Sequence, residues 1–134
     1  MPDDDRRALL AAAWRLPLVR LLLTTMGLRR AQRLLARAPT RAPPRTDVAH
    51  WHARTRALQR IGARMPDTRC LARSLTLWWW MRGHGLQPDL RIGIRRTRTA
   101  SPAGHAWVEC NGQLFDQDPA TLTDYAAIHT LHPH

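Results

Sequence analysis

The sequence predicts an α+β domain in which helices come first and a small antiparallel sheet follows. Helix-like segments occupy most of the first 83 of the 134 residues. Segments that alternate with a period of two follow them, together with a strong hairpin signal. Helices and strands that are segregated along a chain favour this fold class. The length suits one domain with a single modest core.

Residues 1–46 read as a basic helical region and a linker. A leucine- and arginine-rich stretch runs to about Ala38, and Pro17 interrupts its most apolar part. A membrane span needs roughly twenty nearly uncharged residues, and this stretch falls short. It fits a basic amphipathic helix that contacts a membrane or a partner, or a helical pair that covers the core with its arginines in solvent. We favour the helical pair. Residues 39–46 hold three prolines and predict a linker.

Asp47 can cap a second helix that runs to about Met65. Two histidines in its first turns, His50 and His52, are too close together to share a helix face. We therefore expect no metal site there and expect both side chains to be solvated. The residues that recur at helical spacing predict one buried face: Val48, Trp51, Thr55, Leu58 and Ile61.

A central helix is predicted to carry the reactive residue. Asp67 or Thr68 can cap its start, and Gly83 stands where a C-terminal glycine is common. From Cys70 to Met81 it is apolar on almost every side, which is typical of a helix packed inside a domain. Cys70 lies in the first turn, where unpaired N–H groups and the positive end of the helix dipole favour the nucleophilic thiolate.

Three consecutive tryptophans, at positions 78–80, step about 100° apiece around that helix. They cannot all face one core. Either at least one of them lines a substrate groove or a partner surface, with Trp78 and Trp79 as candidates, or they fill cores on both sides of the helix.

The second half of the chain predicts three strands and a closing helix. Residues 90–94 alternate apolar and polar, and residues 105–110 form a second strand. Asn111-Gly112 is a strong signal for a two-residue hairpin turn, which leads to a third strand over residues 113–117. A short helix, residues 120–127, then precedes a histidine-rich tail. Its histidines suggest weak metal affinity at most: His129, His132 and His134.

The predicted hairpin brings an acid opposite a histidine. With a two-residue turn Cys110 faces Gln113, and counting outward brings His105 opposite Asp118. Directly opposed residues share a face, with Cβ atoms about 5 Å apart. Cys110 is an odd number of residues from His105 and points to the other face, so Cys70 is the candidate nucleophile. Cysteine hydrolases use such a set: a thiol, a histidine base and an acid that orients the ring.

The charge is unevenly distributed. The formal net charge is +11, and all 21 basic residues are arginine. Residues 1–64 hold 14 Arg against 4 Asp, a net charge of +10, whereas residues 65–134 are close to neutral. Two cysteines give no disulfide framework, and no signal-peptide cleavage pattern is visible, so we expect a reducing, cytoplasmic setting. We expect no cofactor and no metal.

Three motifs together resemble the transglutaminase-like cysteine proteases: Cys70-Leu-Ala-Arg-Ser-Leu, Leu90-Arg-Ile-Gly-Ile, and His105-Ala-Trp-Val-Glu followed by a hairpin and an acid. Among these proteins, the likeness is closest to the small leader peptidases of lasso-peptide biosynthesis, and it covers residues 66–128 well.

The resemblance implies a papain- or transglutaminase-like fold, with the N-terminal helices and the cysteine-bearing helix packed on the sheet. A peptidase core over residues 47–134 would follow the basic region of residues 1–46 within a single domain. The implied activity is cleavage of the leader from a ribosomally made precursor peptide, which frees the core for closure by a macrolactam synthetase. Residues 1–64 contain no convincing strand, so we expect leader binding by a separate protein, a RiPP recognition element.

In that family the acid commonly lies twelve residues after the histidine, at a position that is Gln117 in this sequence. Asp116 and Asp118 flank it. We favour Asp118 because the turn signal supports it, with Asp116 in reserve. Trp107 could shield the active site, and Glu109 is expected at its rim. Cys70 N–H is a natural oxyanion donor, and the second donor is not identified.

Two other function classes stay open. The net charge and six tryptophans are compatible with a nucleic-acid-binding or scaffold protein without catalysis. We do not expect nucleic acid as a partner, because no recognised binding motif is present and the arginines are scattered around helices. An acyl transferase could use the same triad, because an amine can resolve a thioester as water does.

Overall fold

In the part of the chain that the structure describes, three helices precede four strands, as the α+β prediction requires. The computed structural model describes residues 3–38, 47–65, 70–95, 104–115 and 125–131. The helices are α1 (Asp3–Ala36), α2 (Val48–Ala63) and α3 (Cys70–Gly83). The strands are β1 (Asp89–Arg95), β2 (Gly104–Cys110), β3 (Gln113–Phe115) and β4 (Tyr125–Leu131).

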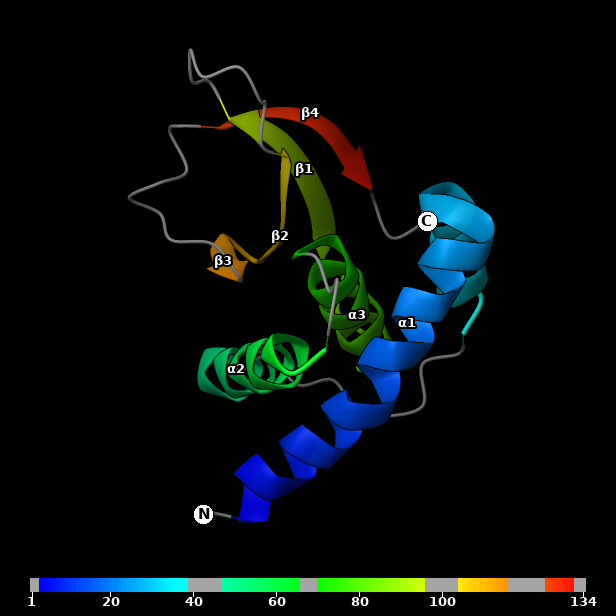
Figure 1. The fold of residues 1–134 in the computed structure, drawn as a ribbon. Coiled ribbons are helices and arrows are strands. Elements are labelled where there is room, and N and C mark those ends of the chain that lie inside the picture. Colours follow the sequence, from blue (N-terminus) through cyan, green and yellow to red (C-terminus); the bar gives the residue numbers. More distant parts are fainter. Residues whose placement is uncertain (1–2, 39–46, 66–69, 96–103, 116–124, 132–134) are drawn as a thin grey trace.

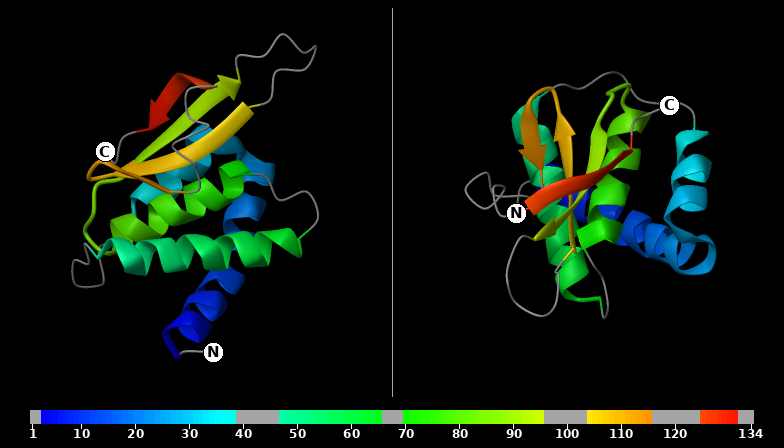
Figure 2. Two further views of the ribbon diagram at one scale, coloured as in Figure 1. Left: turned by 90° about the vertical axis from the view of Figure 1, so that its left-hand side faces the viewer. Right: turned by 90° about the horizontal axis from the view of Figure 1, so that it is seen from above.

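The sheet forms one layer, and the helices lie on one side of it (Figure 1). The left view of Figure 2 shows the same separation of strands and helices, and the right view looks onto the sheet with helices behind it. Helix α3 is central, because it contacts α1, α2, β1 and β2. That position explains why α3 is apolar on nearly every side, as predicted.

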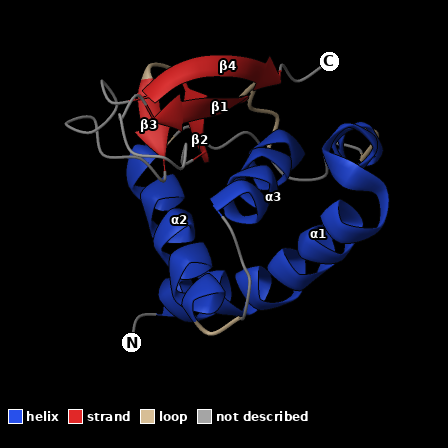
Figure 3. Cartoon of the chain, turned by 45° about the horizontal axis from the view of Figure 1, so that its top comes forward, coloured by secondary structure: helices blue, strands red, loops and turns tan. Residues whose placement is uncertain are grey.

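Helix α1 consists of two helical segments that meet at Gly27, where φ is 79° and ψ is 171°. Only glycine adopts this conformation at little cost. Figure 3 shows the resulting change of direction. The predicted helical pair is thus confirmed, but Pro17 lies inside the first segment without ending it. The first segment packs a face of small and medium apolar residues into the core: Ala8, Ala12, Leu16 and Val19.

By length and composition, the helix over Asp5–Ala36 is also apolar enough to cross a membrane, which the sequence argument had excluded. The same test is passed by helices of soluble proteins. In this fold the helix packs against α2 and α3 and contributes to the core.

Helix α2 begins as predicted. Asp47 is its N-cap, and the Asp47 carboxylate accepts a hydrogen bond of 3.1 Å from the N–H of Ala49. The expectation of a solvated His50 is wrong. His50 is buried, with its ring edge-on to Trp51 at 4.8 Å between centroids. His52 is half-buried against Phe115.

Helix α3 ends at Gly83, but the glycine with a left-handed conformation is Gly85, with a φ of 78°. The Gly85 N–H donates to the Arg82 carbonyl, and the Leu86 N–H donates to the Met81 carbonyl. This pair of bonds is a Schellman motif with Gly85 at the left-handed position. The predicted end of the helix at Gly83 is confirmed, and the left-handed residue lies in the His84-Gly85 exit that follows it.

The four strands have the spatial order β3-β2-β1-β4, and all neighbours are antiparallel. The hairpin turn is confirmed, because Asn111 and Gly112 both have positive φ values, 52° and 79°. Such values define the type I′ turn that Asn-Gly favours. Cys110 faces Gln113, as predicted.

The closing helix predicted over residues 120–127 is wrong at its end, because residues 125–127 belong to β4. The rest of that segment lies outside the described residues. Strand β4 pairs with the free side of β1, and the register shifts by one residue between Ile92 and Gly93. A bulge of this kind lets one extra residue fit without breaking the ladder. Because β4 includes position 129, His129 is a strand residue. His132 and His134 lie outside the described residues.

Candidate active site

Cys70 is the first residue of α3 and is half-buried. Its sulfur accepts a hydrogen bond of 3.3 Å from the backbone N–H of Ala106 in β2. The two residues are 36 positions apart in the sequence, so this contact is produced by the tertiary fold. The predicted caps, Asp67 and Thr68, lie outside the described residues.

A second contact holds the same strand residue to the same helix. Ser74 lies one turn after Cys70, on the same face of α3. Its buried hydroxyl donates a 3.0 Å hydrogen bond to the carbonyl of Ala106. Among the described residues, β3 pairs with β2 from Val108 to Cys110. Beyond that point, α3 supplies hydrogen-bond partners to both backbone groups of Ala106, and this fixes the start of α3 against β2.

His105 directly precedes Ala106 and pairs with Gly93 of β1. One peptide unit separates the Cα of His105 from the N–H that contacts the sulfur. The Cys70 sulfur therefore lies within about 6 Å of the His105 Cα, from the 3.3 Å hydrogen bond and standard backbone lengths. The two residues are brought together at the level of the backbone. The imidazole lies outside the part of the chain that the structure describes.

The three candidates for the orienting acid position, residues 116–118, lie outside the described residues. The described part of the hairpin does fix its register, with Val108 opposite Phe115 and Glu109 opposite Leu114. These pairs agree with the two-residue turn from which Asp118 was predicted as the partner of His105. The choice of Asp118 over Asp116 and Gln117 stays a prediction.

Trp107 and Glu109 alternate with Ala106 and Val108 along β2. Trp107 is buried, and its indole N–H donates to a carboxylate oxygen of Glu109 at 3.2 Å. The other oxygen of Glu109 lies 2.9 Å from Nε of Arg91 on β1. These contacts join the beginning of β1 to the end of β2. A shielding role for Trp107 stays a prediction.

The consecutive tryptophans of α3 mainly fill the interior. Trp78 has no exposed surface, and its indole N–H donates to the carbonyl of Pro88 at 3.1 Å. Trp80 is also buried and lies near Trp51 of α2, with ring centroids 6.4 Å apart. Trp79 is half-buried and edge-on to Trp14 of α1. Contact with substrate by any of them stays a prediction.

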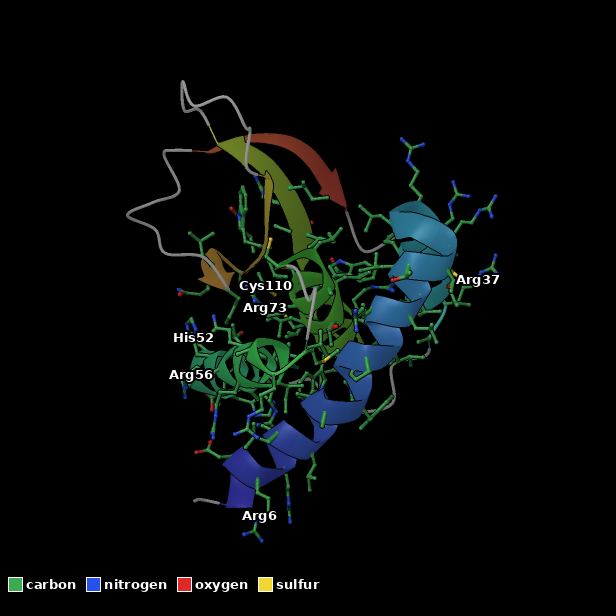
Figure 4. The ribbon with its side chains drawn as sticks, viewed as in Figure 1. Arg6, Arg37, His52, Arg56, Arg73 and Cys110 are labelled. Atoms are coloured by element: carbon green, nitrogen blue, oxygen red, sulfur yellow. The ribbon has the colours of Figure 1, made fainter. Side chains whose placement is uncertain are left out.

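Cys110 has the surroundings of a structural cysteine. It is buried and free, and it borders a cavity of about 100 Å³ that Met81, Leu86 and Phe115 also line. Burial raises the pKa of the Cys110 thiol, and Asp89 adds to this effect. Because a protonated thiol is a poor nucleophile, these surroundings make Cys110 a weaker candidate nucleophile than Cys70. Figure 4 labels Cys110 near the β2–β3 hairpin.

Within the described ranges, no group of three His, Cys, Asp or Glu side chains could hold a metal ion.

A model of the transglutaminase-like superfamily matches residues 10–130. The chain belongs to the transglutaminase-like superfamily. This superfamily typically contains cysteine proteases and acyl transferases. Comparisons with curated proteins and with solved structures found no match to the chain. In this transglutaminase-like protein the match extends from α1 to β4.

Sequence reasoning missed the part that Ala106 and Ser74 play in this transglutaminase-like site. The spacing of four residues between Cys70 and Ser74 was visible, and it puts both side chains on one helix face. The acceptor and donor on Ala106 were not visible, because backbone groups of an alanine carry no sequence signal.

Proposed function

We propose that this protein is a cysteine peptidase that releases the leader from a ribosomally made lasso-peptide precursor. The observation that carries the catalytic part is the hydrogen bond from the Ala106 N–H to the Cys70 sulfur. It joins the first residue of α3 to the backbone next to His105. Membership of the transglutaminase-like superfamily supports thiol chemistry at such a cysteine.

The surroundings of Cys70 favour the thiolate over the thiol. The sulfur lies at the start of a helix of 14 residues, where the helix dipole favours negative charge. A hydrogen bond to a charged acceptor is stronger than one to a neutral acceptor, so the Ala106 N–H adds to this preference. The thiolate is the form that attacks a carbonyl carbon.

In the proposed reaction His105 accepts the proton of Cys70, and the sulfur attacks the carbonyl carbon of the scissile peptide. The Cys70 N–H, at the helix start, stabilises the oxyanion of the tetrahedral intermediate. Collapse of that intermediate breaks the C–N bond, and His105 donates its proton to the departing amine. Water, deprotonated by His105, then hydrolyses the thioester and restores the thiol. Asp118, or Asp116 in its place, orients the imidazole.

The precursor as substrate rests on the resemblance of the Cys70 and His105 motifs to the lasso leader peptidases. On this proposal the departing amine is the new N-terminus of the core peptide, which a macrolactam synthetase consumes. A separate leader-binding protein presents the precursor in the cytoplasm. The basic helical half of the chain is the candidate docking surface for that protein or for the precursor.

Acyl transfer is the second candidate, because transglutaminase-like enzymes include both reaction types. In that reaction an amine rather than water attacks the thioester on Cys70. Nucleic-acid binding has less support. Four of the six tryptophans are buried and cannot stack on bases: Trp51, Trp78, Trp80 and Trp107.

The first experiment needs no precursor. Iodoacetamide should alkylate Cys70 of the native full-length protein much faster than Cys110, and His105→Ala should slow the alkylation of Cys70 near neutral pH. Cys110→Ala is the matched control and should leave the rate at Cys70 unchanged. If His105→Ala has no effect on that rate, the proposed thiol–imidazole pair is wrong.

The second experiment incubates the protein with a lasso-type precursor and a leader-binding protein and follows the products by mass spectrometry. We expect leader release by the wild type and by Cys110→Ala. Cys70→Ala and His105→Ala should each lower the rate by about 10³-fold or more. A mass increase equal to an added amine acceptor, instead of hydrolysis, would establish the acyl-transfer alternative. Leader release by Cys70→Ala at the normal rate would refute the assignment.

A further inference from the structure

The first segment of α1 carries a row of large apolar side chains on its outer side. Their exposed fractions are unusually high for leucine and tryptophan. The spacings of four, four and three residues place them on one face of a helix. We refer to these four residues as the α1 stripe: Leu10 (66% exposed), Trp14 (52%), Leu18 (38%) and Leu21 (58%).

Polar side chains next to the α1 stripe pack over aromatic rings or donate hydrogen bonds to carbonyls of α1. The Arg15 guanidinium lies over the rings of Trp14 and Trp80, at 4.3 and 4.8 Å from their centroids, and donates to the Ala11 carbonyl. Burial lowers the pKa of Arg15, and the charge of Arg54 adds to the effect.

At the far end of the stripe, the hydroxyls of Thr24 and Thr25 donate to helix carbonyls one turn earlier. The stripe therefore presents an apolar surface without competing donors from these neighbours.

Cations bracket this apolar surface. Exposed Arg6 and Arg7 precede the stripe by one turn and lie on its two sides at helical spacing. Beyond Gly27, four exposed arginines follow: Arg29, Arg30, Arg33 and Arg37. Figure 4 shows Arg6 and Arg37 near opposite ends of α1. From Arg6 to Thr46 the sequence contains ten arginines and no acidic residue.

We propose that the α1 stripe binds the surface of an anionic lipid bilayer, with α1 lying in the plane of the membrane. A Trp- and Leu-containing apolar face with basic residues beside it is the pattern of interfacial helices. From Arg6 to Thr46, directly after Asp3-Asp4-Asp5, the charge is purely positive, and it complements the continuous negative charge of an anionic bilayer.

The fold also decides between lying on the membrane and crossing it. The face opposite the stripe packs Ala8, Ala12 and Leu16 into the core, where they have at most 1% of their surface exposed. A spanning α1 would have to leave this core and expose α2 and α3. A helix that lies at the membrane surface can keep its contacts with the core while the α1 stripe contacts lipid.

The test is flotation of the full-length protein with lipid vesicles. One set of vesicles contains about one third phosphatidylglycerol in phosphatidylcholine, and the other is pure phosphatidylcholine. We expect partition into the anionic vesicles at low ionic strength and a marked decrease in high salt. The variant pair Leu10→Gln/Leu21→Gln should weaken partition roughly fiftyfold, because two exposed leucines no longer enter the apolar layer.

Charge is tested with matched pairs. Arg6→Gln/Arg7→Gln, beside the stripe, should weaken partition roughly 25-fold, at about fivefold for each arginine near the surface. Arg56→Gln/Arg60→Gln removes two exposed arginines from α2 instead and should have a much smaller effect. All six positions are at the surface, so circular dichroism should report unchanged folding.

Three results would overturn the proposal. The first is no partition of the wild type into anionic vesicles. The second is equal weakening by both arginine pairs with no effect of the leucine pair, which would indicate nonspecific charge attraction. The third is a wild-type dimer in solution that the leucine pair dissociates, which would show that a second copy of the chain covers the stripe.

Discussion

Removal of the Ser74 hydroxyl tests whether the contact between α3 and Ala106 organises the site. In Ser74→Ala, the Ala106 carbonyl loses the 3.0 Å hydrogen bond that it accepts from α3. Ser74 has no exposed surface, so water cannot readily replace the hydroxyl. The start of α3, which carries Cys70, would then be held to β2 less firmly.

The expected cost follows from two opposing effects. A buried carbonyl left without its partner costs about 1–3 kcal/mol. Alanine is a better helix former than serine and returns about 0.5 kcal/mol. The net loss of unfolding free energy is therefore about 0.5–2.5 kcal/mol. For a chain of 134 residues the unfolding entropy is about 0.3 kcal/mol/K, so Tm should fall by about 2–8 °C.

Thr76→Val is the matched control on the same helix. Thr76 is as deeply buried as Ser74, but its hydroxyl donates to the Ala72 carbonyl within α3 at 2.7 Å. That carbonyl is also within reach of its regular helical N–H partner, so the loss should stay below about 0.5 kcal/mol. Thermal unfolding followed by circular dichroism measures both variants. Iodoacetamide alkylation of Cys70 should also change in rate in Ser74→Ala and stay constant in Thr76→Val.

An equal Tm decrease in the two variants would refute this reasoning, because it would mean that the contact to β2 adds nothing to a local helix bond. An unchanged Tm together with unchanged alkylation in Ser74→Ala would refute it more strongly.

Three further predictions concern the hairpin, the core and Cys110. Gly112→Ala should lower the free energy of unfolding, measured in urea, by about 1–2 kcal/mol because φ is +79° there. Gly83→Ala in α3 should raise it by up to about 1 kcal/mol. No atom would lie within 4 Å of either new Cβ, so a change of the same sign in both variants would contradict the conformational argument. Trp78→Phe should cost about 2–4 kcal/mol in the same assay, since it leaves a void and an unpaired Pro88 carbonyl, while Trp14→Phe at the surface should cost little. The raised pKa of Cys110 means that the folded state holds its proton more tightly than the unfolded state, so stability should be constant below the ordinary value of about 9 and fall as pH rises above it; Cys110→Ala should abolish that part of the pH dependence.

The fold was predictable where local chemistry and tertiary environment agree. The Asp47 cap, the alternation in β1 and the Asn111-Gly112 turn are each determined by residues close in sequence. Strand β4 was not predictable in this way. Its sequence Tyr-Ala-Ala-Ile-His-Thr-Leu contains alanines that suit a helix, and its strand conformation depends on pairing with β1.

Burial of polar residues was the second limit. Helical spacing identified the face of α2 that contains Trp51 and Leu58, and both are buried. The same spacing could not show that His50 would be covered as well, by aromatic rings that include Trp51 and His84. His84 follows α3, so the periodicity of α2 does not describe this part of the cover.

The candidate site was predictable as residue types and elements, but its central contact was not. Cys70 at a helix start and His105 on a strand follow from the sequence pattern. Their approach depends on backbone groups of Ala106, whose side chain carries no chemistry. Only the packing of α3 against β2 reveals that contact.

The contacts of Ala106 also bear on association between molecules. Strands at a sheet margin can recruit a further strand through their free N–H and C=O groups, and this is a common route to aggregation. At Ala106 a thiol and a hydroxyl from α3 already occupy both groups. A foreign peptide can therefore extend the sheet at Ala106 only if it displaces both the sulfur of Cys70 and the hydroxyl of Ser74.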